Sequence, residues 1–150
     1  MPDQNPQPIA RVSHRSFHSL FTPFPTVCFT GALATDLIYW KTAEMMWADA
    51  SAWLLAIGIL FGILAAIAAL VDLFARRISI EGPLTLYLAC SAVILVLSVF
   101  NSLVHSRDAW TSVVPEGLIL SSIVVIFILV AAWINWTLLY RRTAGVSHER

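Results

Sequence analysis

Long apolar stretches alternate with short polar connections along the chain. Three stretches, 50–71, 82–104 and 117–140, contain no acidic or basic residue, and a fourth, 20–40, is interrupted only by Asp36. A helix of roughly 20 apolar residues crosses about 30 Å of hydrocarbon. The pattern therefore predicts an all-α fold, an integral membrane bundle of four transmembrane helices at about 22–40, 51–73, 83–104 and 117–140.

The two ends of the chain are polar by comparison. Residues 1–16 carry three prolines, and 143–150 contain no apolar run. We expect a flexible tail at 1–16, a transmembrane domain at 17–142 and a second tail at 143–150. The first apolar stretch starts about twenty residues into the chain and holds Asp36, so we interpret it as a retained helix rather than a cleaved signal peptide. Pro23 and Pro25 suit its first turn, where the missing N–H is not needed.

Composition narrows the class of protein. The chain is 59% hydrophobic and 12% charged, with a mean hydropathy of +0.80, whereas about 25% of residues are charged in an average soluble domain. This excludes a soluble globular domain, a disordered chain and a coiled coil. The formal net charge is zero, so no basic patch is available for nucleic acid. The lipid bilayer is the expected environment.

Basic residues predict the orientation of the helices. If the four spans alternate in direction, seven of the nine basic residues fall on one side of the membrane. The positive-inside rule places that side, and with it both termini, in the cytoplasm. We therefore expect a multi-pass protein of the bacterial cytoplasmic (inner) membrane. The residues on the cytoplasmic side are Arg11, Arg15, Arg76, Arg77, Arg141, Arg142 and Arg150, against Lys41 and Arg107 outside.

Two acidic residues fall within the predicted spans. A charge at mid-bilayer costs on the order of 2.5–3.5 kcal/mol on insertion scales, so Asp36 and Asp72 are candidate functional residues. Asp36 lies near the outer boundary close to Lys41, and Asp72 lies near the inner boundary in an i,i+4 pair with Arg76. Because neither lies at mid-membrane, structural anchoring is favoured over proton transfer.

Further polar side chains follow one face of the third span and enter the fourth. Steps of three, four and seven residues place them on one side of a helix, and we expect that side to face the bundle interior. Hydrogen bonding between helices is the favoured role, and a polar path or ligand pocket is the alternative. The residues are Ser91, Ser98, Asn101, Ser102 and His105 in the third span, and Asn135 in the fourth.

Small residues recur at four-residue spacing in the first two spans. Gly58, Gly62 and Ala66 lie on the second, and Gly31 and Thr35 on the first. Such stripes let helix backbones approach closely. The contact they predict is either between these two helices or between two copies of the chain.

The positions of the histidines and cysteines do not predict a cofactor site. His18 and His105 are the candidates for axial ligands of a b-type haem, but they lie at opposite boundaries of the membrane, nearly its full thickness apart. Cys28 and Cys90 lack a C-x-x-C spacing or a metal-ligand cluster. No nucleophile, phosphate-binding or zinc motif occurs. We therefore expect no catalytic residue, no metal and no cofactor.

Several segments resemble one bacterial membrane family, domain of unknown function 2231. The stretch HSLFTPFP (18–25) resembles its H-P-x-x-x-P-F-P entrance, and GALATDLIYW (31–40) resembles its first helix. WADASAWLL (47–55) is similar to its F-W-A-x-x-S-x-W-L-L stretch, and LVDLF (70–74) followed by RRI (76–78) resembles the exit of its second helix. Trp133 and the ending 139–146 resemble its closing motif. The resemblance implies four helices in a bacterial membrane.

The chain departs from that pattern at three places. It has Gly82-Pro83-Leu84 where family members often carry a His and an Asn, Asn135-Trp136 where they carry paired glycines, and Arg142 in place of a final His. The resemblance also implies a redox setting, since members of the family are sometimes fused to a Rieske-type iron–sulfur domain.

The favoured function is that of a non-enzymatic structural or accessory subunit of a membrane complex. Its expected partners are the bilayer and either further copies of the chain or a larger complex, with no nucleic acid. The alternative is a haem- or quinone-associated electron-transfer subunit that works with an iron–sulfur partner. A small transporter is a third, less favoured hypothesis, because broken helices and an inverted repeat are absent from the pattern.

Overall fold

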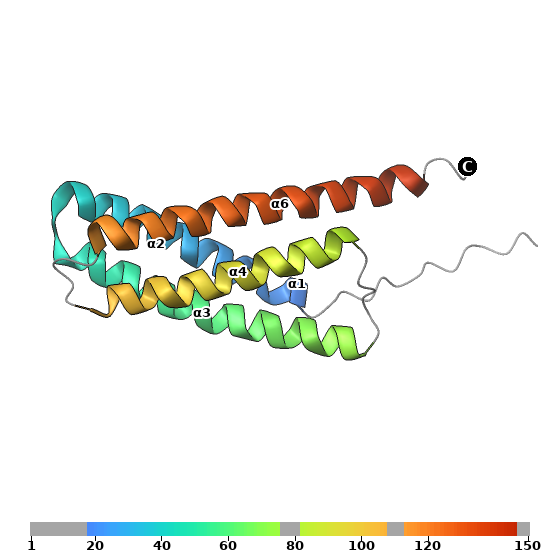
Figure 1. Cartoon of the computed structure of the whole chain (residues 1–150), viewed down its shortest axis with the longest axis horizontal. Coiled ribbons are helices and arrows are strands. Elements are labelled where there is room, and N and C mark those ends of the chain that lie inside the picture. Colours follow the sequence, from blue (N-terminus) through green and yellow to red (C-terminus); the bar gives the residue numbers. More distant parts are fainter. Residues whose placement is uncertain (1–17, 76–81, 108–112, 147–150) are drawn as a thin grey trace, which may run out of the picture.

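A computed structural model describes residues 18–75, 82–107 and 113–146, and all regular structure in these ranges is helical (Figure 1). A short α1 (His18–Phe21) leads into α2 (Pro23–Thr42), which is followed by α3 (Met45–Phe74) and α4 (Gly82–His105). A short helical segment, η1 (Val113–Gly117), is kinked at Val114 and continues into α6 (Leu118–Val146).

Two boundaries differ from those predicted. α3 begins at Met45, six residues before the predicted 51, and Asp49 in its early turns is exposed at the end of the bundle. A charged residue in the first turns does not interrupt a helix. The charge of Asp49 therefore marks the edge of the apolar stretch and not the start of the helix. α6 continues to Val146 and so includes residues expected to form the tail.

Three of the described helices are long and apolar enough to cross a membrane. They are Met45–Phe74, Leu84–His105 and Val113–Thr137. The predicted first span corresponds to α2, a helix of 20 residues that contains Asp36 and Lys41. The all-helical, membrane-type fold expected from the sequence is therefore present.

The four long helices form a closed ring of contacts. α2 contacts α3, α3 contacts α4, α4 contacts α6, and α6 returns to contact α2. The turn between α2 and α3 is tight: Ala43 adopts a left-handed backbone (φ 54°, ψ 23°), and its N–H donates to the carbonyl of Tyr39 at 2.8 Å. Successive long helices therefore run in opposite directions, as short connections require.

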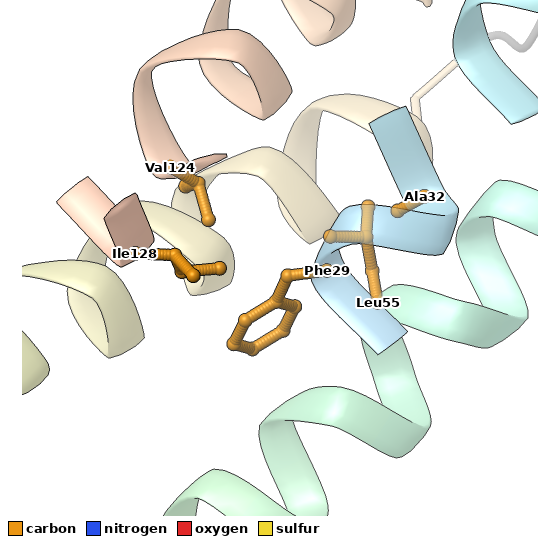
Figure 2. Close-up of a cluster of buried hydrophobic side chains, with 5 residues drawn as sticks. All are labelled: Phe29, Ala32, Leu55, Val124 and Ile128. Atoms are coloured by element: carbon orange, nitrogen blue, oxygen red, sulfur yellow. The ribbon is translucent and has the colours of Figure 1, made fainter. Parts of the chain in front are cut away.

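The apolar core lies where α2, α3 and α6 meet (Figure 2). Phe29 and Leu55 are 2% and 1% exposed, and the remaining members are Ala32, Val124 and Ile128. Gly58 makes room for the Phe29 ring, because a Cβ built there would stand 2.5 Å from it.

The other glycines at small-residue spacing also face neighbouring helices. A Cβ at Gly62 would stand 2.8 Å from the side chain of Leu95 on α4, and one at Gly31 would stand 3.3 Å from Leu54 on α3. The glycine positions therefore serve close packing inside the chain.

Candidate functional site

Five polar side chains meet inside the bundle, near the end where α2 turns into α3. We call them the polar cluster: Asp36, Ser51, Asn101, His105 and Ser121. α2, α3 and α6 contribute one residue each and α4 contributes two. The exposed fractions of these residues lie between 0% and 6%. Each long helix of the ring therefore sends at least one polar side chain to the same enclosed site.

The carboxyl group of Asp36 is the centre of the polar cluster. The Ser51 hydroxyl donates to Oδ1 at 2.5 Å, and the Ser121 hydroxyl donates to Oδ2 at 2.5 Å. Nε2 of His105 lies 3.0 Å from Oδ1. Nδ2 of Asn101 donates to Oγ of Ser121 at 2.7 Å, which leaves the Ser121 proton for Asp36. Both carboxyl oxygens are thus hydrogen-bonded, as burial requires.

The hydrogen bonds of His105 determine the charge of the site. Nδ1 lies 2.9 Å from the carbonyl oxygen of Asn101, which can only accept, so Nδ1 carries a hydrogen. The contact between Nε2 and Oδ1 of Asp36 then needs a proton as well. That proton belongs either to an imidazolium beside a carboxylate or to a carboxylic acid beside a neutral imidazole. In both arrangements Asp36 and His105 together carry no net charge, which is the least costly state inside a membrane.

Helical spacing brings these residues to the interior. On α4, Ser98, Asn101 and His105 follow steps of three and four residues, and all three are buried. The buried positions of the other helices follow the same steps. In the first half of α3 they are Ala48, Ser51, Leu55 and Gly58, and on α6 they are Ser121, Val124, Ile128, Ala131 and Ile134.

The arrangement differs from that of a catalytic triad. In a triad the carboxylate and the nucleophilic hydroxyl lie on opposite nitrogens of the imidazole. Here Asp36 and Ser51 both face Nε2, at 3.0 and 3.3 Å, and the Ser51 proton points to the carboxylate. Ser51 is also fully buried. The imidazole therefore does not receive the Ser51 proton as it would in a triad, and the hydroxyl is enclosed within the bundle.

The contacts of His105 do not favour its use as a metal or haem ligand. Both ring nitrogens of His105 already have protein partners. In the described part of the chain, no group of three or more His, Cys, Asp or Glu side chains is placed to hold a metal ion. His18 lies in α1, at the start of the chain's helical part, and its side chain falls outside the described residues.

The expected partner of Asp36 has to be corrected. Lys41 was expected to reach it, but Lys41 is exposed, while Asp36 is fully buried and bonded to Ser51, Ser121 and His105. The reason is helical direction: Lys41 lies five residues on and faces outward, whereas Asp36 faces the ring interior.

The other predicted polar residues lie apart from the polar cluster. Asp72 is fully buried near the far end of α3, and its expected partner Arg76 falls outside the described residues. Asn135 is exposed on the far half of α6. Ser91 donates to the carbonyl of Tyr87 on its own helix at 2.9 Å. The expected polar face of α4 thus joins the polar cluster only in its second half.

Ser51 and Ser121 were not among the residues singled out from the sequence. A single serine in an apolar helix is common, and neither lies in a recognisable catalytic motif. Their positions could have identified them. Each occupies one of the small or buried positions that recur at three- and four-residue steps along the inner face of its helix.

Comparison with known proteins places the chain in a family without assigning a reaction. No curated protein and no solved structure matches it. A family model described as "Predicted membrane protein (DUF2231)" matches residues 14–148, nearly the whole chain. The resemblance seen in the sequence motifs is thereby confirmed, and the chain belongs to the DUF2231 family of predicted membrane proteins.

Proposed function

We propose that this protein is a non-enzymatic accessory subunit of a bacterial inner-membrane complex, with four membrane spans and both termini in the cytoplasm. The observation that carries the proposal is the polar cluster. It links all four long helices through one carboxyl group and is closed to solvent at 0–6% exposure. A site of this kind fixes the helices relative to one another and offers no access to a substrate.

The same contacts support α2 as the fourth span. Its 20 residues give a length of about 30 Å at about 1.5 Å per residue, which matches the hydrocarbon thickness. Asp36 is the charged residue inside this helix, and Lys41 lies in its last turn. Because His105 neutralises Asp36 and two serines bond it, Asp36 adds no uncompensated charge to the span.

The orientation is supported by the distribution of basic residues, seven on the side of the termini and two on the other. A reporter fused after Arg150 tests it. Green fluorescent protein at this position is expected to fluoresce, because it folds in the cytoplasm. A fused alkaline phosphatase, which is active only outside the cytoplasm, is expected to be inactive, and an active one would overturn the orientation.

The outward faces of the helices support a role among other membrane components. Large apolar side chains cover them, among them Trp53 at 70% and Trp133 at 74% exposure. In a bilayer such faces contact lipid or other helices. The polar cluster fixes the shape of the bundle, so these faces present a constant surface to a partner.

Purification of the tagged full chain in a mild detergent tests the accessory role. We expect a complex of fixed stoichiometry that survives a high-salt wash and is recovered again when the partner carries the tag. A lone monomer without any stoichiometric partner would overturn this role. An absorption spectrum of the same sample is expected to show no Soret band, and a Soret band would instead favour an electron-transfer subunit.

A further inference from the structure

The half of the bundle away from the polar cluster contains a cavity of about 610 Å³. All four long helices line it: 25–29 at the start of α2, 62–73 in the second half of α3, 87–96 of α4 and 128–135 in the middle of α6. In Figure 1, α3 and α6 diverge toward this end. Pockets that hold small ligands measure about 300–1,000 Å³, so the cavity is large enough for one molecule.

The walls of the cavity are apolar and recessed. Gly62, Ala66, Ala92 and Ala131 are among its small lining residues, and two members of the apolar core, Phe29 and Ile128, also line it. Ala66 and Ala92 are exposed, so the cavity opens sideways to the surroundings of the bundle. In a membrane those surroundings are hydrocarbon, and the wall chemistry favours an alkyl chain.

The length of the cavity matches one leaflet of a bilayer. On α3 its lining extends from Gly62 to Leu73, eleven residue steps, or about 16 Å at about 1.5 Å per residue. Half of a hydrocarbon core of about 30 Å is about 15 Å. A chain that enters at the end of the bundle and stops at Phe29 would therefore span the leaflet.

Polar groups gather at the end of the cavity that lies away from Phe29. Tyr87 and Asn135 both line it there. The Asn135 side chain is exposed within the apolar segment Val113–Thr137 and forms no hydrogen bond with the described part of the chain. An amide at this depth needs a partner, because hydrocarbon supplies none.

Positive charge follows on the same helix. Arg141 and Arg142 come six and seven residues after Asn135 on α6, about 9–11 Å further along its axis. The order along the helix is thus apolar cavity, neutral amide, then two cations. A glycerophospholipid has the complementary order of acyl chain, ester carbonyl and anionic phosphate.

We propose that the cavity binds one glycerophospholipid of the inner leaflet. One acyl chain lies between α3, α4 and α6, Asn135 donates to an ester carbonyl, and the phosphate lies at the level of Arg141 and Arg142. The assignment to the inner leaflet rests on the orientation proposed above.

Native mass spectrometry of the isolated full chain, delipidated and then titrated with dioleoylphosphatidylglycerol, tests the site. We expect one lipid bound per chain. Ala66→Leu, which fills the cavity, is expected to weaken retention about tenfold, the scale of one lost contact of about 1.4 kcal/mol. Ala56→Leu is the matched control, because Ala56 is also exposed on α3 but does not line the cavity.

A second pair of variants tests the polar end without changing the core. Asn135→Leu is expected to weaken lipid retention about tenfold, and Asn135→Gln to restore most of it. Circular dichroism and monodisperse elution establish that each variant is folded. Because Asn135 is exposed, this pair remains informative if Ala66→Leu does not fold.

Three results would overturn the proposal. One is equal lipid retention by Ala66→Leu and Ala56→Leu in folded protein. Another is extraction of an isoprenoid quinone, in place of phospholipid, from protein purified without delipidation. The third is that the isolated chain forms a dimer that retains no lipid. The retention and dimer results concern the isolated chain and leave the stoichiometric partner of the accessory role to be judged separately, whereas a bound quinone would also favour the electron-transfer alternative.

Discussion

Gly117 lies directly against the imidazole ring of His105. A Cβ at this position would stand 2.6 Å from Cε1 and 3.2 Å from Nδ1 of the ring. η1 therefore brings bare backbone onto the ring, while Asn101 and Asp36 hold its two nitrogens. The ring is enclosed on its Cε1 side by the one residue type that lacks a side chain.

Gly117→Ala is expected to displace the His105 ring and weaken its bond to Asp36. The added methyl group cannot be accommodated without movement, and overpacking of this kind typically costs about 1–3 kcal/mol. The apparent Tm in detergent is expected to fall by several degrees. Gly82→Ala is the control, because nothing lies within 4 Å of a Cβ there. Equal Tm values for the two variants would contradict the contact.

Two neighbouring serines on α6 separate a bond between helices from a bond within one helix. Ser121 connects Asn101 to Asp36, whereas Ser122 donates to the carbonyl of Leu118 at 2.8 Å. Ser121→Ala is expected to lower the free energy of unfolding by about 1–2 kcal/mol, and Ser122→Ala by much less. Unfolding by sodium dodecyl sulfate in mixed micelles measures both. A larger loss for Ser122→Ala would be inconsistent with the polar cluster.

Removal of the central carboxyl group is expected to be the most damaging single change. Asp36→Ala removes the group to which two serine hydroxyls and the His105 ring are hydrogen-bonded, and breaking a buried pair costs about 3–5 kcal/mol. Asp49→Ala, an exposed acidic residue on α3, is expected to have little effect. The comparison uses the same unfolding assay, and similar losses for both variants would refute the central role of Asp36.

A double-mutant cycle tests whether Asp36 and His105 act as one neutral unit. Because either residue alone leaves an unpaired group in the interior, the loss in Asp36→Ala/His105→Ala is expected to fall short of the summed single losses by about 1–3 kcal/mol. The measurement is the free energy of unfolding of the four proteins. Strict additivity would show that the two side chains do not interact.

The turn between α2 and α3 offers a stabilising substitution. Ala43 has φ 54°, a region that costs an L-residue about 1–2 kcal/mol relative to glycine. Ala43→Gly is therefore expected to raise the apparent Tm. Ala75, which follows α3, has φ −73°, and Ala75→Gly is expected to leave Tm unchanged or to lower it. A decrease for Ala43→Gly would contradict the turn geometry.

The sequence predicts the helices well because a membrane imposes a length on apolar segments. It predicts partners poorly, because periodicity weakens when all faces of a helix are apolar. The local choice of Lys41 for Asp36 illustrates this: the residues that bond Asp36 lie 15, 69 and 85 positions away. Which of these distant residues meet Asp36 depends on how the helices pack, and the spacing of residues within one helix does not contain that information.

Part of the candidate site was nevertheless within reach. The alternation of spans places Asp36 and His105 at the same boundary of the membrane, and opposite charge favours their pairing. Ser51 and Ser121 required one more step, which is to recognise the inner face of each helix from its small residues. Asn101 was predicted to face inward, and it is fully buried.

The contribution of α6 to the polar cluster has a consequence for biogenesis. Oδ2 of Asp36 is bonded by Ser121, 85 residues later in the chain. In the four-span arrangement proposed above, that oxygen lacks the Ser121 donor until α6 has joined α2, α3 and α4. Completion of synthesis is therefore coupled to closure of the bundle. A chain truncated before α6 would keep the bonds of Oδ1 to Ser51 and His105 but would leave Oδ2 without the Ser121 hydroxyl, so the polar cluster is complete only once α6 is present.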